Sequence, residues 1–181
     1  MKNYSIKIAL RGVSPMIWRR LRIPGSTSLA DLHHMIQIVF GWDDDHLHRF
    51  HIYGKDYGIA YVGGLSFSDN PYAVYLDDFE FDVGDRFTYE YNFFELWLHD
   101  IRIEAIETVS TSPSGPFCIK GNGMPSATKY DEVERTMDLV KAIVNSDKST
   151  TVEDILCQIE ALDAVRFNRK KVNHRLADMS D

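Results

Sequence analysis

The sequence predicts a single α+β domain. We expect a mixed or mostly antiparallel sheet, one helix after the first two strands, and two helices toward the C-terminus. Two observations support this fold class. Apolar and polar residues alternate, as in half-buried strands, in several runs between residues 4 and 106. Apolar residues recur at helical spacing once after the second of these runs, and twice more near the end of the chain.

The first elements lie within residues 4–41. Alternation over residues 4–10 and 17–23 predicts two strands, and the second ends at a Pro-Gly pair. Ser28 is typical of a helix N-cap, and apolar residues then recur at helical spacing as far as residue 40. Gly41 stands where a C-cap glycine is expected, so we predict that the helix ends there.

The remaining elements follow in chain order. Three segments alternate as strands do: residues 46–53, 87–93 and 97–106. Two segments have no clear period: residues 58–78 and the Pro- and Gly-rich residues 110–128, which we expect to form a long loop. Two segments have helical spacing: residues 130–144 and 152–162.

The size and charge of the chain limit the classes of function. A chain of 181 residues can bury the core of one domain, which we expect over residues 1–172, with a polar tail over residues 173–181. The net charge of −7 disfavours binding to nucleic acid, because phosphates attract Lys and Arg. The sequence has no run as long as a membrane span and no signal-peptide pattern. We therefore expect a cytoplasmic protein that does not bind membranes.

His46 and His48 are candidate ligands for a divalent metal. Side chains two residues apart on a strand share a face and lie about 6–7 Å apart, so both imidazoles could bind one ion. His99, on a later strand, and Asp45 could complete the site. We favour the alternative that these side chains form structural hydrogen bonds and no metal cofactor is bound, because the sequence contains no complete ligand motif.

Asp43, Asp44 and Asp45 directly follow the predicted helix. This is the negative end of the helix dipole, where carboxylates need a partner cation or full solvation. They could bind Mg²⁺ or Ca²⁺, but the alternating ligands of an EF-hand loop are missing. We favour a turn in which Asp43 and Asp44 accept backbone N–H bonds and one carboxylate pairs with a nearby arginine.

The arginines in question, Arg19, Arg20 and Arg22, form a dense basic group beside Trp18. Arginines next to an aromatic ring could contact a nucleic-acid base or another ring. In an acidic chain we favour the alternative, a solvated strand face that balances the aspartates.

Three stretches carry a resemblance to a known family. They read YSIKIALRGVSPMIWRRLRIP, then TSLADLHHMIQIVFGWDDDHLHRFHIYG, then YEYNFFELWLHDIRIE followed by CIKGNGMPSATKY. Together they resemble the plasmid pRiA-type third-open-reading-frame-like family, whose members are also labelled transposon passenger proteins or resolvases. The resemblance implies a compact α+β domain from a plasmid or mobile element, and no particular activity. The resolvase label finds no support, because the chain lacks a serine nucleophile flanked by arginines.

The third stretch departs from the family pattern, which reads Tyr-Asp-Phe-Gly-Asp-Asp-Trp, any residue, then His. The matching residues are Tyr91, Phe93, Trp97 and His99, and the differing ones are Asn92, Phe94, Glu95 and Leu96. If the aspartates of the family pattern act together in a reaction, this chain lacks most of the residues that the reaction needs. Trp97 remains a candidate binding residue.

Three functions are compatible with these observations. We favour a non-enzymatic interaction module that receives a protein or peptide on its sheet face or long loop. The second is a metal-assisted hydrolase or phosphoryl-transfer enzyme built on His46, His48 and His99. The third is a nucleic-acid accessory protein of a mobile element.

Overall fold

The computed structural model describes residues 1–108, 115–125, 137, 141 and 167–179. These residues form one seven-stranded sheet with the strand order β4-β3-β5-β6-β1-β2-β7. The strands are β1 (Lys2–Leu10), β2 (Trp18–Pro24), β3 (His48–Ile52), β4 (Lys55–Tyr57), β5 (Arg86–Tyr91), β6 (Trp97–Thr108) and β7 (Phe117–Asn122). Each neighbouring pair is antiparallel. The helices are α1 (Leu29–Phe40), the short 3-10 helix η1 (Leu76–Phe79) and α4 (Arg169–Ala177).

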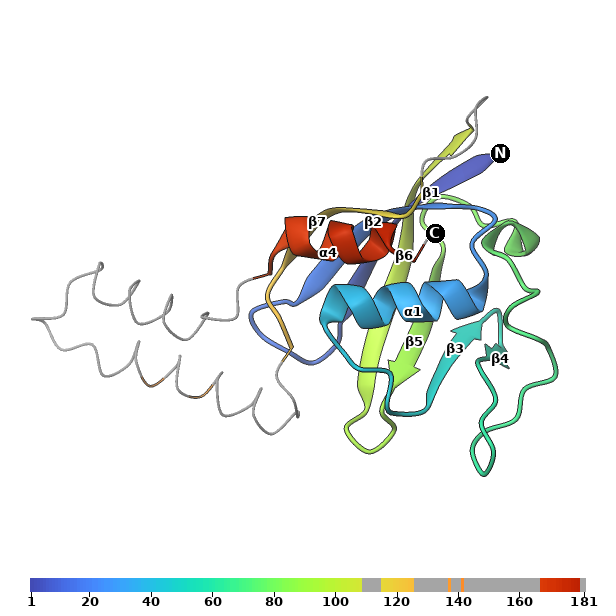
Figure 1. Cartoon of the computed structure of the whole chain (residues 1–181), viewed down its shortest axis with the longest axis horizontal. Coiled ribbons are helices and arrows are strands. Elements are labelled where there is room, and N and C mark those ends of the chain that lie inside the picture. Colours follow the sequence, from blue (N-terminus) through green and yellow to red (C-terminus); the bar gives the residue numbers. More distant parts are fainter. Residues whose placement is uncertain (109–114, 126–136, 138–140, 142–166, 180–181) are drawn as a thin grey trace, which may run out of the picture.

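The sheet has one covered face and one open face. Helices α1 and α4 lie against the covered face (Figure 1). Alternating residues of β1 point into the core beneath them, including the fully buried Tyr4, Ile6 and Ile8. The open face carries ion pairs between neighbouring strands, such as Arg20 with Glu104 at 2.5 Å and Arg49 with Glu90 at 2.8 Å. The alternation seen in the sequence thus separates a core face from a charged face.

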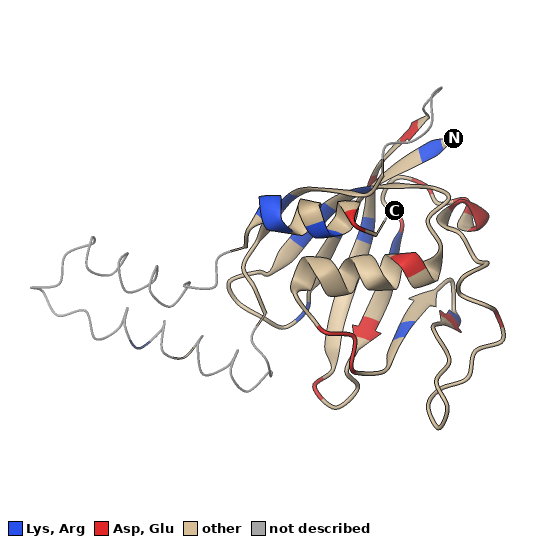
Figure 2. Cartoon of the chain, viewed as in Figure 1, with Lys and Arg blue, Asp and Glu red and all other residues tan. Residues whose placement is uncertain are grey.

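Helix α1 begins and ends where the sequence predicts. The Ser28 hydroxyl accepts a hydrogen bond from the backbone N–H of Asp31 at 3.0 Å, as an N-cap does. Gly41 adopts a left-handed conformation with φ of 80°, and its N–H donates to the carbonyl of Gln37 at 2.9 Å. Figure 2 shows acidic residues along the segment that leaves this end of α1. The cap therefore directs the three aspartates away from the helix, across the end of the sheet.

The predicted fold class is confirmed in its main features: an α+β domain, an antiparallel sheet and a helix after the second strand. Two corrections concern the C-terminal part. Residues 117–122 of the expected loop form β7, because they pair with β2. Residues 173–177 of the expected polar tail belong to α4, whose Val172 and Leu176 are buried. The helices predicted at 130–144 and 152–162 lie outside the described residues. No helix in the described part of the chain is long and apolar enough to cross a membrane.

Candidate functional site

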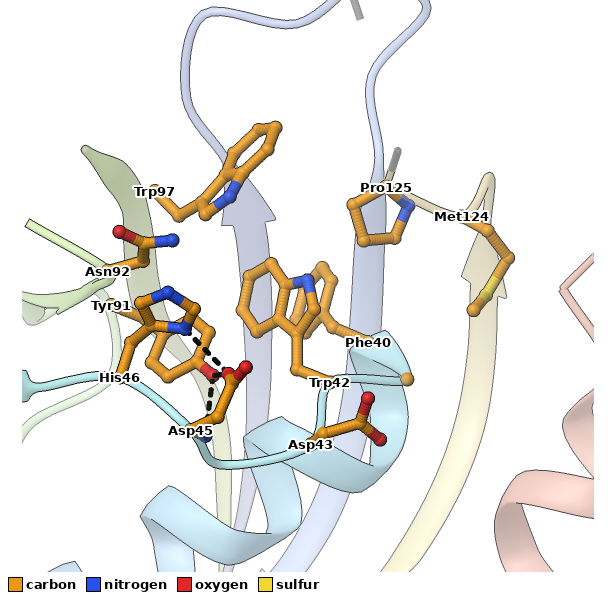
Figure 3. Close-up of a pocket in the computed structure, with 11 residues that line it drawn as sticks. Phe40, Trp42, Asp43, Asp45, His46, Tyr91, Asn92, Trp97, Met124 and Pro125 are labelled. Carbon is orange, nitrogen blue, oxygen red and sulfur yellow. Dashed lines mark hydrogen bonds and ion pairs between the residues drawn. The ribbon is translucent and has the colours of Figure 1, made fainter. Parts of the chain in front are cut away.

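A cavity of about 380 Å³ lies where α1 ends beside the turn that joins β5 and β6 (Figure 3). Its lining residues are Phe40, Gly41, Trp42, Asp43, Asp45, His46, Tyr91, Asn92, Trp97, Met124 and Pro125. They come from the last residue of α1 and the segment after it, from both ends of the β5–β6 turn, and from the chain just after β7. This volume is at the small end of the range for ligand pockets and suits one side chain or a short segment.

Aromatic rings form the wall of the cavity. Trp42 stacks on Tyr91, with ring centroids 4.9 Å apart, and on Phe40 at 5.3 Å. Trp97 lies 6.2 Å from Trp42, and the edge of His99 meets Trp42 at 5.1 Å. Because these rings pack against each other and against the core, the wall is preformed and needs little reorganisation to receive a ligand.

Asp45 provides one negative charge at the edge of the cavity. Its carboxylate accepts a hydrogen bond from the Tyr91 hydroxyl at 2.8 Å and contacts His46 Nδ1 at 2.6 Å. The bond from Tyr91, followed by the one from His46, lowers the pKa of Asp45. In turn, the backbone N–H of Asp45 donates to the Tyr91 oxygen at 3.2 Å. This reciprocal pair keeps Asp45 ionised and fixes it to the aromatic wall.

Asn92 closes the cavity from the β5–β6 turn. Its side-chain oxygen accepts hydrogen bonds from the backbone N–H groups of Phe94 at 3.2 Å and Glu95 at 3.3 Å. An aspartate at this position would accept the same two bonds, so asparagine serves the turn equally well. Its amide nitrogen faces the cavity (Figure 3) and has no hydrogen-bond partner among the described residues.

The tip of the β5–β6 turn is apolar and exposed. Phe94 is 96% exposed and Leu96 is 52% exposed. Leu96 also has a φ of 52°, a left-handed conformation that costs a branched side chain roughly 1 kcal/mol or more. A strained, exposed leucine contributes little to the fold.

Replacing Leu96 with asparagine should therefore stabilise the protein. Asparagine tolerates positive φ, so we expect the free energy of unfolding to rise by about 0.5–1 kcal/mol. Urea unfolding followed by tryptophan fluorescence measures the change. Phe94→Asn is the matched control, because it removes a similarly exposed apolar residue from the same turn without the strain. A loss of stability in Leu96→Asn would show that the leucine packs more tightly than its exposure indicates.

A buried hydrogen-bond relay lies beneath the segment with the aspartates. Gln37 Nε2 donates to the Tyr89 oxygen at 2.9 Å, and Tyr89 O–H then donates to His33 Nδ1 at 2.8 Å. This leaves the proton of His33 on Nε2, which donates to the Asp44 carboxylate at 2.7 Å. The backbone N–H of Asp44 donates to Gln37 Oε1 at 3.1 Å, and Asp44 has a φ of 56°. The relay thus holds Asp44 in a left-handed conformation and positions its two aspartate neighbours.

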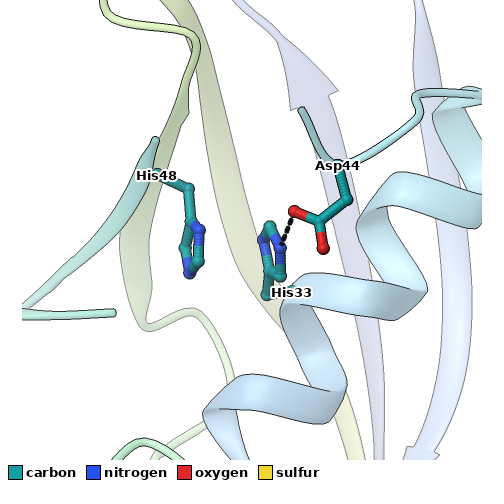
Figure 4. A group of neighbouring side chains, drawn as sticks. All are labelled: His33, Asp44 and His48. Atoms are coloured by element: carbon teal, nitrogen blue, oxygen red, sulfur yellow. Dashed lines mark hydrogen bonds and ion pairs between the residues drawn. The ribbon is translucent and has the colours of Figure 1, made fainter. Parts of the chain in front are cut away.

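His33, Asp44 and His48 could also hold a metal ion, since one ligand atom from each lies within 4.8 Å of the others (Figure 4). The rings of His33 and His48 stack with centroids 3.5 Å apart and 12° between their planes. Ring lone pairs that run nearly parallel do not converge on one ion unless a ring turns. Both nitrogens of His33 already have partners in the relay. Structural hydrogen bonding therefore explains His33 and Asp44 better than metal binding, whereas His48 accepts from the N–H of Ile59 at 3.3 Å through Nε2 and has a buried Nδ1 without a partner among the described residues.

The predicted metal ligands lie in different surroundings and have different partners. Within the described residues, the close group of potential ligands contains His48 but not His46, His99 or Asp45. His46 pairs with Asp45 at the cavity. His99 is buried, and its Nδ1 donates to the carbonyl of Tyr89 at 3.2 Å.

The predicted basic group is divided between the two faces of β2. Arg19 is fully buried on the core face, whereas Trp18, Arg20 and Arg22 alternate with it on the open face. The expected pairing of an arginine with the aspartates is wrong, because Arg20 pairs with Glu104 and Asp44 with His33. Arg22 lies over the ring of Phe117 at 5.9 Å, and Arg20 over Trp18 at 5.3 Å.

Sequence reasoning missed two residues of the site. Tyr91 was noted only as a match to the family pattern, yet its hydroxyl anchors Asp45. Trp42 was not singled out, although a tryptophan directly before three aspartates is a usable signal of an aromatic and acidic site. Trp97 and Asp43 were expected in a binding site, and both line the cavity.

Comparisons with known proteins agree with the fold and with the family resemblance. A family profile described as "Plasmid pRiA4b ORF-3-like protein" matches residues 2–174. The chain is 30% identical over 123 residues to "Uncharacterized protein y4hQ" of Sinorhizobium fredii (strain NBRC 101917 / NGR234), a match that covers 65% of this chain and 61% of that protein. The crystal structure of a protein of unknown function, MM3350 from Methanosarcina mazei Go1, aligns with a TM-score of 0.63 at 25% identity, over 86% of this chain and 89% of that one. The chain belongs to the plasmid pRiA4b ORF-3-like protein family.

Proposed function

We propose that the protein is an interaction module that binds a segment of a protein or peptide partner in the cavity between the end of α1 and the β5–β6 turn. The observation that carries the proposal is a preformed aromatic cavity next to an exposed apolar tip. Trp42 and Trp97 line the cavity, and Phe94 protrudes from the turn that borders it. Aromatic residues that are rigidly held at a concave site are typical anchors of protein interfaces.

The composition of the turn supports a macromolecular partner. At two positions where the family pattern has glycine and aspartate, this chain has Phe94 and Leu96. The substitutions add exposed apolar surface and remove charge beside the cavity. An exposed apolar patch at a concave site is typical of a surface that contacts another protein.

The open sheet face is less suited to this role. Arg20 and Arg49, two of its prominent cations, already form ion pairs with Glu104 and Glu90 on neighbouring strands. A ligand at this face would compete with ion pairs that are already formed.

A peptide display library selected against the wild-type protein tests the proposal. We expect selected peptides to bind Trp42→Ala at least about tenfold more weakly, since loss of an interface anchor costs about 1.4 kcal/mol or more. Because Trp42 also packs against the core, Phe94→Ser is the second variant, and we expect it to weaken binding without unfolding the protein. Tyr72→Ser is the control, because Tyr72 is exposed but lies outside the cavity. Peptides that bind all variants as tightly as the wild type would contradict the proposal.

A further inference from the structure

Negative charge converges on one side of the cavity. The C-terminal end of α1 opens there through Phe40 and Gly41, and this end of a helix carries about half a negative charge. Asp43 and the ionised Asp45 line the same cavity. Carboxylates beside the C-terminal end of a helix are unfavourable by roughly 0.3–1 kcal/mol each unless a cation is close or water solvates them, and Asp43 is exposed to solvent.

Partners within the chain compensate only part of this charge. Asp44 contacts His33, and Asp45 contacts His46. The carboxylate of Asp43 has no hydrogen-bond or ion-pair partner in the described part of the chain. Arg19 compensates the end of α1 itself, because its Nε donates to the carbonyl of Val39 at 2.6 Å, and its other donors are taken by backbone carbonyls and by the sulfur of Met124, so the carboxylate of Asp43 is the charge that stays without a cation in the described part of the chain. An uncompensated carboxylate at the edge of a preformed cavity indicates where a positively charged group would bind.

A second, independent observation indicates what carries the positive group. Asn92 as a residue is only 7% exposed, and its amide nitrogen faces the cavity without a partner among the described residues (Figure 3). A simple cation cannot accept a hydrogen bond from this nitrogen, whereas a peptide carbonyl can. A peptide segment with a basic side chain satisfies both groups at once.

We infer that the segment bound in this cavity carries an arginine or lysine side chain, whose positive group pairs with Asp43 while a nearby backbone carbonyl accepts from Asn92. The inference rests on the proposed function and adds the chemical class of the partner. Trp42 and Tyr91 then contact the apolar stem of the basic side chain, which long cationic side chains bury along apolar surfaces. The acidic chain as a whole, with its net charge of −7, attracts a basic partner at long range.

Two tripeptides that differ in one charge test the inference. Acetyl-glycyl-arginyl-glycinamide carries a guanidinium group, and the citrulline analogue has nearly the same shape without the charge. Each is titrated into ¹⁵N-labelled full-length protein, with the Trp42 indole and Asn92 amide signals as the readout. We expect the arginine peptide to bind about three- to tenfold more tightly, and added salt to reduce the difference.

Two variants test which carboxylate of the protein causes the preference for arginine. Asp43→Asn is expected to remove the preference for arginine, because it removes the unpaired carboxylate and keeps the shape. Glu107→Gln makes the same change of charge at the other end of β6, roughly 30 Å along the strand from Trp97, and should keep the preference.

Equal binding of both tripeptides to the wild type, or an unchanged preference in Asp43→Asn, would overturn the inference. The proposed function would still stand if display-selected peptides required Trp42 and Phe94. If neither tripeptide shifts the Trp42 or Asn92 signals, the inference is also overturned, and the display experiment alone then decides whether the cavity binds partners.

Discussion

Replacing Arg19 with methionine is expected to lower the free energy of unfolding by at least about 3 kcal/mol. Arg19 is fully buried, and its five N–H donors are all used. Nε donates to the carbonyl of Val39 at 2.6 Å, and the terminal nitrogens donate to the carbonyls of Trp18, Asn122 and Gly123. Methionine would fill part of the volume but leave these carbonyls without a donor. Urea unfolding at neutral pH measures the loss.

The neighbouring arginine is a matched control. Arg20 lies on the opposite face of β2, and its partner Glu104 is partly exposed, so Arg20→Met should cost less than about 1 kcal/mol. Arg19→Lys should also destabilise the protein, because an ammonium group has three donors and cannot reproduce the planar arrangement of the guanidinium. Equal losses in Arg19→Met and Arg20→Met would show that the buried bonds contribute little beyond a surface ion pair.

The contrast between these two arginines shows what a local sequence pattern can predict and what it cannot. Alternation places Arg19 with Leu21 and Ile23 on the apolar face of the strand, yet its charge suggested a place in an exposed basic group. The acceptors that make its burial possible come from the end of α1 and from β7. A local alternation of apolar and polar residues carries no information about hydrogen bonds between such distant segments. The sequence could therefore predict which face of the strand Arg19 occupies, but not the acceptors that make its burial possible.

β7 was missed for a related reason. Its segment contains glycine and lies among prolines, which favours a loop by composition. It becomes a strand because β2 offers an unpaired edge, with Leu21 opposite Cys118 and Arg22 opposite Phe117. Strands with strong alternation and a helix with both caps could be predicted, whereas a strand formed mainly by pairing could not.

The candidate site was predicted in part. The three aspartates and Trp97 were predicted as candidate site residues, and they line the cavity or lie directly beside it. The predicted pairing with an arginine was wrong, because Asp44 contacts His33 on the preceding helix α1. No local pattern indicates the relay, because the second partner of His33, Tyr89, lies 56 residues away. The short spacing of His46 and His48 suggests that both bind one metal ion. However, β3 begins at His48, so His46 lies before the strand and the two side chains have different surroundings.

The stacked histidines make the fold sensitive to acid. Burial, followed by the charge that His34 can carry, lowers the pKa of His33 to about 3. Burial and the neighbouring His33 lower the pKa of His48 to about 3 as well. Both rings are therefore neutral in the folded protein between pH 3 and 6.5, whereas both bind protons in the unfolded chain below its ordinary pKa of 6.5.

The sign of the effect follows from proton binding. Above pH 6.5 neither state is protonated at these rings, and the full stability is present. As the pH falls below 6.5, the unfolded state gains protons that the folded state cannot bind, so the free energy of unfolding decreases. Two such groups should lower it by about 2–4 kcal/mol between pH 7 and pH 5. Urea unfolding at pH 7, 6 and 5 measures this slope.

A histidine variant separates this effect from general acid sensitivity. In His48→Leu one of the two buried rings no longer titrates and the stack is lost, so the slope should fall to about half or less. His51→Ala is the control, because His51 is exposed and pairs with Asp56 at the surface, and it should leave the slope nearly unchanged. An unchanged slope in His48→Leu would mean that other groups cause the acid sensitivity. A halved slope would show that burial of the stacked rings of His33 and His48 sets the lower pH limit of the folded site, where His33 also holds Asp44 through the relay.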